Sequence, residues 1–210
     1  MRATESVRRE ALPLFPLQAV LFPDGLLGLK VFEARYVDLM SSCLRERAPF
    51  GVIALRSGAD VHRPGDSVTF ESVGTLAELV DVDSDRPGIL QVSCRGGSRF
   101  RVLASEQRHD GLWLARTEAV ADDETLAPTE SQRASVRGLI EAIAAMKAQG
   151  IAPFLEPHRF DDAGWVANRW CEILPISVAA KFRLMELADP LMRLQLVDDY
   201  LRSKGVVGTG

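Results

Sequence analysis

Residues 12–17 read Leu-Pro-Leu-Phe-Pro-Leu, and this stretch decides how the chain begins to fold. Each proline fixes its own φ angle and disfavours the helical region for the residue before it. The stretch is therefore extended, and its apolar residues favour a partly buried strand. Because proline cannot donate a hydrogen bond to a neighbouring strand, we expect an edge strand or the first strand of a sheet. The charged, aperiodic residues 1–10 predict a loose arm.

The apolar stretches that follow continue the extended pattern and then change period. The run Val20-Leu21-Phe22 ends at the turn Pro23-Asp24-Gly25, and residues 26–31 predict a strand. Beyond them apolar residues recur at spacings of three and four, which predicts an amphipathic helix of about four turns that Pro49 closes. The apolar face of this helix is expected to contain Phe32, Tyr36, Leu39, Met40, Cys43 and Leu44.

Strand patterns dominate residues 50–120. A glycine inside a strand pattern often marks a bulge or a barrel corner, so we expect a long strand over residues 68–82 to bend at Gly74. About seven short strands around one inserted helix favour a closed or half-closed barrel, because closure removes exposed strand edges. The remaining strands are expected at residues 50–56, 88–94, 99–106 and 112–120, with a loop at 57–66 and turns at 95–98 and 109–111.

The last third of the chain has helical patterns. An acidic stretch at residues 121–130 predicts a linker, and an apolar stripe at 136–144 predicts the first helix after it. Asp161 or Asp162 can cap the next helix, and Ser177 can cap a third. Asp189 followed by Pro190 predicts the start of a fourth. A helical hairpin or small bundle is therefore expected.

Composition and charge limit the class of protein. The 210 residues are 47% hydrophobic and 26% charged, which is typical of one globule, or of one globule with a helical appendage. A net charge of -4 opposes the phosphate contacts that nucleic-acid binding requires. The three cysteines lie far apart and indicate a reducing compartment. The prolines after residue 12 argue against a secretion signal, and no apolar run would span a membrane, so we expect a cytoplasmic protein.

Catalytic motifs are hard to find in the sequence. The phosphate-binding patterns G-x-x-x-x-G-K-[ST] and G-x-G-x-x-G are absent, which excludes ATP hydrolysis. The three histidines, His62, His109 and His158, fall in separate expected loops without a metal-ligand spacing. The stretch Gly65-Asp66-Ser67-Val68-Thr69 differs from a nucleophile elbow at its last position, and a strand rather than a helix follows it. We expect no catalytic residue, no cofactor and no metal.

A few polar and aromatic residues leave alternatives open. Residues 96–99, Gly-Gly-Ser-Arg, favour a plain hairpin turn over an anion-binding nest. The charged run from Glu33 to Arg35 is either a solvated helix start or an ion pair that ties the helix to the barrel. Trp170 lies on an apolar stripe and is expected in the core, whereas Trp165 is expected to be partly exposed.

Three stretches together resemble a known family. Residues 12–17, the run Val20-Leu21-Phe22-Pro23 and residues 31–36, Val-Phe-Glu-Ala-Arg-Tyr, closely resemble the opening signature of the Lon substrate-binding domain in order and spacing. Residues 73–77, 97–102 and 174–189 resemble later parts of the same domain, so the resemblance covers about residues 11–203. The family commonly has glycine after the Phe-Pro pair, whereas this sequence has Asp24 there. Gly25 follows, so the glycine is shifted by one residue.

The resemblance implies an α+β fold and a binding role. It implies a PUA-like β-barrel with one inserted helix at residues 11–121, followed by a C-terminal helical bundle at residues 128–203. It also implies recognition of polypeptides, with an unfolded polypeptide or a specific protein as partner. Lon continues into an ATPase and a serine-lysine protease that this sequence does not contain, so we expect an adaptor or chaperone-like protein and no enzyme. The oligomeric state stays open.

The motif residues mostly have a structural explanation, so the binding surface must be sought elsewhere. We expect an apolar groove where barrel and bundle meet, with Phe22, Phe154 and Trp165 as candidate peptide-binding residues. The alternative function is RNA binding, which the PUA-like resemblance suggests. That alternative requires a basic stripe, which could form from Arg95, Arg99, Arg101, Arg108 and Arg116.

Overall fold

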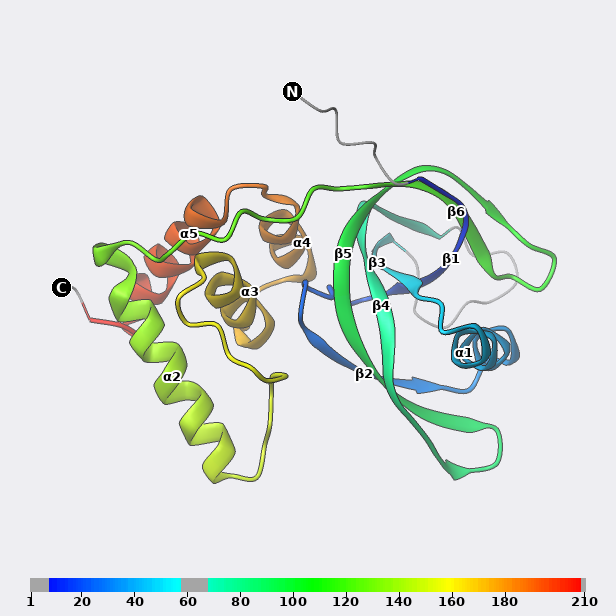
Figure 1. Ribbon diagram of the computed structural model, residues 1–210, viewed down its shortest axis with the longest axis horizontal. Helices are drawn as coiled ribbons and strands as arrows, with labels where there is room; N and C mark the ends of the chain where they lie inside the picture. The colour runs from blue at the N-terminus through cyan, green and yellow to red at the C-terminus, as the bar shows by residue number, and fades with distance from the viewer. Residues whose placement is uncertain (1–7, 58–67, 209–210) are drawn as a thin grey trace. The chain divides into compact units, whose positions relative to one another are not determined.

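The computed structural model describes residues 8–57 and 68–208, which fall into two compact units (Figure 1). Unit 1 is Met1–Asp122 and contains the strands and one helix. Unit 2 is Asp123–Gly210 and is helical. None of the helices in the described ranges is both long and apolar enough to cross a membrane. The expected loop at 57–66 lies, after its first residue, outside the described residues.

Unit 1 is built on a mixed six-stranded sheet with the order β2-β5-β4-β3-β1-β6. Its β1–β3 pairing is parallel, and the other pairings are antiparallel. Because β6 pairs with both β1 and β5, the pairings return to β5 and join five strands in a ring. The strands are β1 Arg8–Leu17, β2 Leu26–Val31, β3 Phe50–Ser57, β4 Thr69–Arg86, β5 Ile89–Gln107 and β6 Trp113–Ala119.

Strand β1 confirms the extended conformation predicted from its prolines. Of the two predicted positions it takes that of the first strand in the chain and not that of an edge strand. Its C-terminal half, Leu14 to Leu17, pairs with β3, and its N-terminal half, Arg8 to Leu14, pairs with β6. Each half therefore pairs on one side only along most of its length. On the unpaired side no strand needs the backbone N–H group that proline lacks. The loose arm was also predicted too long, because β1 begins at Arg8.

The stretch at residues 95–98 is not the predicted turn, since β5 continues through it as one strand. The Gly96 amide donates to the carbonyl of Gly25 at 2.9 Å, and the Gly96 carbonyl accepts from the amide of Asp24 at 2.8 Å. A Cβ atom on Gly96 would lie 2.1 Å from the carbonyl oxygen of Phe22. The glycine therefore permits a close backbone approach, and its occupied amide excludes the anion nest.

Helix α1, Ala34–Glu46, inserts between β2 and β3 as predicted but begins two residues later than the apolar pattern suggested. Glu33 is its N-cap, so Phe32 lies outside the helix and is 51% exposed. Arg47, in the left-handed conformation, ends it before Pro49. Leu44 is also exposed, and the buried face consists of Tyr36, Leu39, Met40 and Cys43. That face packs on residues of β1 to β5.

Unit 2 contains the helices that the capping signals predicted. Asp162 rather than Asp161 caps α3, since its carboxylate accepts from the amides of Gly164 and Trp165. Ser177 caps α4 and Asp189 caps α5, which has Pro190 in its first turn. The elements are the 3-10 turn η1 Glu130–Gln132 and the helices α2 Arg133–Ala148, α3 Ala163–Ile173, α4 Val178–Glu186 and α5 Pro190–Ser203.

A buried arginine connects the segments of unit 2. The Arg193 side chain is 1% exposed, and its Nη1 atom donates to Asp123 Oδ2 at 2.5 Å and to Asn168 Oδ1 at 3.1 Å. Its Nε atom donates to the carbonyl of Leu184 at 2.8 Å. Breaking such a buried pair leaves an uncompensated charge, so this network stabilises the start of the unit against α3, α4 and α5.

Candidate functional site

The charged run at the start of α1 is a tie between elements rather than a solvated helix start. Arg35 donates from Nη1 to the carbonyl of Gly111 at 2.9 Å and from Nη2 to Glu33 Oε2 at 2.6 Å. Its guanidinium also lies 4.7 Å from the centre of the Tyr36 ring. Gly111 belongs to the turn between β5 and β6, so the resemblance residues Glu33 and Arg35 hold α1 against that turn.

Other residues that carry the resemblance are also structural. The Tyr36 ring stacks on Phe15 at 4.0 Å between centroids, which joins α1 to β1. The buried Thr75 hydroxyl donates to the carbonyl of Leu21 at 2.6 Å. Because these side chains are buried by the fold, a binding surface has to be built from other residues.

The three predicted binding residues are all buried. Phe22 is fully buried in unit 1, while Phe154 and Trp165 are 5% and 3% exposed. The rings of Phe154 and Trp165 meet edge to face at 6.3 Å between centroids, and the Arg169 guanidinium lies 5.6 Å from the Trp165 ring. The expected partial exposure of Trp165 was therefore wrong. The peptide-binding role of all three residues stays a prediction.

Aromatic residues around Trp165 explain its burial. Phe160 packs edge-on against Trp165 at 5.4 Å, and the His158 ring lies 5.6 Å from it. Trp170 is in the core as predicted, and its indole N–H donates to the carbonyl of Ser135 at 2.9 Å. No pattern in the sequence around Trp165 signalled these contacts, because Phe160 and His158 come from the loop before α3.

The basic stripe that RNA binding would require does not form. Arg99 is 2% exposed and donates to the carbonyl of Ala121 at 2.9 Å, so it does not share an exposed face with Arg101. Three further members have carboxylates beside them on the surface: Arg95 pairs with Asp24, Arg101 with Glu118, and Arg108 with Asp110. Arg116 is left as the exposed arginine of this set without such an ion pair among the described residues. The geometry therefore does not favour the RNA alternative.

The groups that could perform chemistry are buried or dispersed. Burial raises the pKa of Cys94 to about 12, and burial, followed by the charge of Glu46, raises the pKa of Cys43 to about 11. Burial likewise raises the pKa of Cys171 to about 12, so none of these thiols is a thiolate nucleophile at neutral pH. Within residues 8–57 and 68–208, no group of His, Cys, Asp and Glu could hold a metal ion. His62 and most of the candidate elbow lie outside those ranges.

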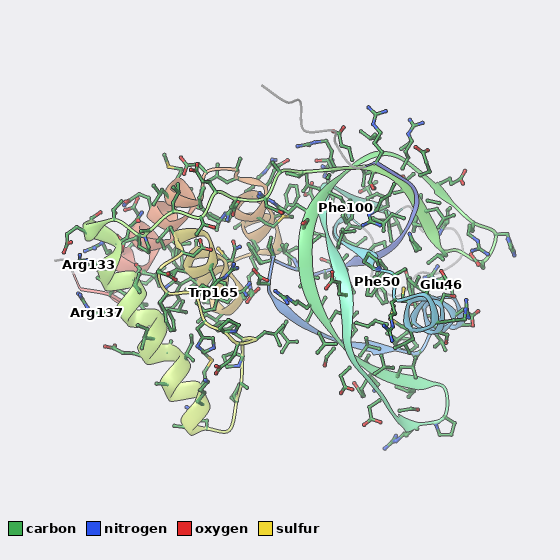
Figure 2. The ribbon with its side chains drawn as sticks, in the orientation of Figure 1. Glu46, Phe50, Phe100, Arg133, Arg137 and Trp165 are labelled. Carbon is green, nitrogen blue, oxygen red and sulfur yellow. The ribbon has the colours of Figure 1, made fainter. Side chains whose placement is uncertain are left out.

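Unit 2 has a surface pocket that the sequence did not predict. Its volume is about 280 Å³, and we name it the arginine pocket. Arg133 and Arg137 lie one turn apart on α2 (Figure 2). Their four-residue spacing was the signal that could have drawn attention to this face. The pocket is lined by Pro128, Arg133, Val136, Arg137 and Phe160.

The fold is that of a mixed-sheet α+β protein. Its described residues form no metal site, and its three thiols are buried and unreactive at neutral pH. The family model of the ATP-dependent protease La (LON) substrate-binding domain matches residues 11–203. The chain therefore belongs to the Lon substrate-binding domain family.

Solved structures agree with this family. A crystal structure of a Lon N-terminal domain protein from Xanthomonas campestris has a TM-score of 0.72 at 29% identity, covering 91% of this chain and 99% of that one. The N-terminal domain of a Mycobacterium avium complex Lon protease has a TM-score of 0.64 and covers 91% of this chain and 97% of that one. Its 16% identity makes it a likeness of fold alone.

Curated relatives are similar over part of their length. Lon protease 2 of Sorangium cellulosum (strain So ce56) is 38% identical over 106 residues, which are 50% of this chain and 13% of that protein. Lon protease 2 of Syntrophobacter fumaroxidans (strain DSM 10017 / MPOB) is 28% identical over 155 residues, which are 71% of this chain and 18% of that protein. The chain thus spans less than a fifth of the length of either relative.

Proposed function

We propose that this chain is a non-catalytic recognition module that binds an unfolded polypeptide or a specific protein partner in the cytoplasm. The observation that carries the proposal is the match to the Lon substrate-binding domain over residues 11–203. An adaptor or chaperone-like role is consistent with the buried thiols and with the absence of a phosphate-binding loop from the sequence. Binding alone, without ATP hydrolysis or peptide cleavage, is the activity we infer.

We infer further that the two units are the two parts that the family resemblance implies. The ring of pairings from β5 through β4, β3, β1 and β6 supports a PUA-like β-barrel at residues 11–121. The contacts of α3 with α2, α4 and α5 support a helical bundle at residues 128–203.

The edge of β2 supports one mode of polypeptide binding. Among the described residues β2 pairs with β5 alone, so its other side can accept an added strand. Leu26 on this strand is 36% exposed, and the neighbouring Phe32 is 51% exposed. Main-chain hydrogen bonds bind extended polypeptides with little dependence on sequence, as recognition of unfolded chains requires. Phe22, Phe154 and Trp165 would contribute only if local opening exposed them.

Fluorescence anisotropy tests the proposed function. The purified protein is titrated into a labelled, permanently unfolded polypeptide and, in parallel, into labelled single-stranded and structured RNA, each at low and high salt. We expect saturable polypeptide binding that persists at high salt, because buried apolar and main-chain contacts are little screened. Salt-sensitive binding to RNA alone would contradict the proposal, whereas binding to neither would contradict recognition of unfolded polypeptides and leave a specific protein as the partner.

A further inference from the structure

The arginine pocket combines two guanidinium groups with an apolar wall. Arg133 and Arg137 stand four residues apart on α2, so their side chains emerge on the same face of the helix. Val136, Pro128 and Phe160 are half-buried and supply the apolar lining. All five residues belong to unit 2.

The apolar wall is held in place by the packing behind it. Phe160 meets the buried Trp165 ring edge to face at 5.4 Å and the His158 ring at 5.5 Å between centroids. A ring packed on two neighbours loses little further freedom when a ligand covers it. The pocket is therefore partly preorganised for an apolar group.

The two arginines differ in their carboxylate partners. Arg133 pairs with Glu130 at 2.8 Å, and both side chains are mostly exposed. Arg137 is exposed and has no ion pair within the part of the chain that the structure describes. A ligand carboxylate can bind Arg137 directly and can compete with Glu130 for Arg133, since such a surface pair contributes little to stability.

The volume limits the size of the ligand. About 280 Å³ lies just below the roughly 300–1,000 Å³ of small-molecule sites, so the pocket suits a single amino-acid side chain with a neighbouring group. Guanidinium forks match carboxylates in geometry and form charge-assisted hydrogen bonds with them.

We propose that the arginine pocket binds an apolar side chain of a polypeptide together with an adjacent carboxylate, which Arg133 and Arg137 hold. The proposal rests on the proposed polypeptide-binding function and gives it a preferred ligand. The carboxylate can come from the C-terminus of the polypeptide or from an Asp or Glu next to an apolar residue. Both sources present the same chemistry to the pocket.

Short labelled peptides test the proposal and separate the two sources. One peptide ends in Phe with a free carboxylate, and its partner carries a C-terminal amide. A second, amidated pair contains an internal Phe-Glu or Phe-Gln. We expect at least one carboxylate form to bind about tenfold or more tightly than its neutral partner, as loss of a charged hydrogen bond implies. The pair that shows this difference identifies the source.

Variants then assign the binding to the pocket. The double variant Arg133→Gln/Arg137→Gln should lose that tenfold preference, whereas Glu130→Gln should strengthen carboxylate binding by freeing Arg133. Arg183→Gln is the matched control, because Arg183 is an exposed helical arginine paired with Glu186 at the same i,i+3 spacing. Equal binding of charged and neutral peptides, or a preference that survives in the double variant, would overturn the proposal. Circular dichroism verifies that each variant is folded.

The unfolded polypeptide of the previous experiment separates this proposal from the proposed function. Polypeptide binding without any arginine-dependent peptide binding overturns the pocket and leaves the function standing. Arginine-dependent peptide binding without binding of the unfolded polypeptide keeps the pocket, overturns recognition of unfolded polypeptides, and leaves a specific protein as the partner. Failure of both assays overturns both the pocket and the recognition of unfolded polypeptides.

Discussion

Gly74 lies on β4 opposite Phe100 of β5, and its missing side chain decides how the strands pack there. A Cβ atom on Gly74 would lie 2.5 Å from the Phe100 ring and 2.6 Å from the carbonyl oxygen of Val52 on β3. The sequence predicted a bend at this glycine, and register shifts flank it: the β3–β4 pairing shifts between Gly74 and Phe70, and the β4–β5 pairing shifts after Thr75. Gly74 also leaves space for the buried Phe100 ring.

Replacing this glycine should destabilise the protein. We expect Gly74→Ala to lower the free energy of unfolding by about 1–3 kcal/mol, because the backbone of Val52 cannot move away easily. Urea unfolding followed by circular dichroism measures the change. Gly28→Ala on β2 is the control: its Cβ would meet nothing within 4 Å, so the expected change stays within about 0.5 kcal/mol. Similar losses in both variants would rule out the close approach as the cause.

At the scale of elements, helix starts were predicted well because their signals are local. The carboxylate of Asp162 accepts from the Gly164 amide at 2.9 Å and from the Trp165 amide at 3.3 Å, which satisfies donors at the start of α3. The sequence left Asp161 and Asp162 as equal candidates, since either could precede the helix. The structure selects Asp162, which is buried, whereas Asp161 is exposed.

The two aspartates provide a matched test of the cap. Asp162→Ala should lower the free energy of unfolding by about 1 kcal/mol, because two amides at the start of α3 lose their acceptor. Asp161→Ala should change it by no more than about 0.5 kcal/mol, as an exposed substitution away from the cap. Thermal and urea unfolding measure both variants. Equal losses would assign the effect to acidic charge near the helix rather than to capping.

At the scale of the whole molecule, both units contain buried thiols. Cys43 and Cys94 lie in unit 1 and Cys171 in unit 2, and all three are buried. Burial raises the pKa of each thiol from its ordinary value near 9 to about 11 or 12. Protection of these thiols therefore reports whether the chain as a whole is folded.

Thiol reactivity and pH dependence follow from that burial. At about pH 8 a thiol-specific reagent should react slowly with the native protein and rapidly with all three thiols in urea. Above about pH 9 the unfolded thiols ionise while the native ones stay protonated, so the free energy of unfolding falls as pH rises. Below that pH the contribution is fully present. Fast labelling of the native protein, or stability that is unchanged between pH 8 and 10, would contradict this.

The sequence by itself determined the local features of this protein. The prolines made residues 12–17 extended, the three-and-four spacing produced α1, and Ser177 and Asp189 marked the starts of α4 and α5. These signals act within one or two turns of the chain, so no partner from elsewhere is needed to interpret them. The resemblance that identified the family rests on the same kind of local pattern.

Only the tertiary structure decided which strands pair and which side chains are covered. Strand β1 has a partner along each half, β5 continues through Gly96, and Arg99 and Trp165 are buried. Each outcome depends on contacts between residues far apart in the sequence, which neither period nor propensity encodes. The same is true of the arginine pocket, where residues before η1, on α2 and before α3 meet. Local physics thus determined the elements, and long-range packing determined the surface they present.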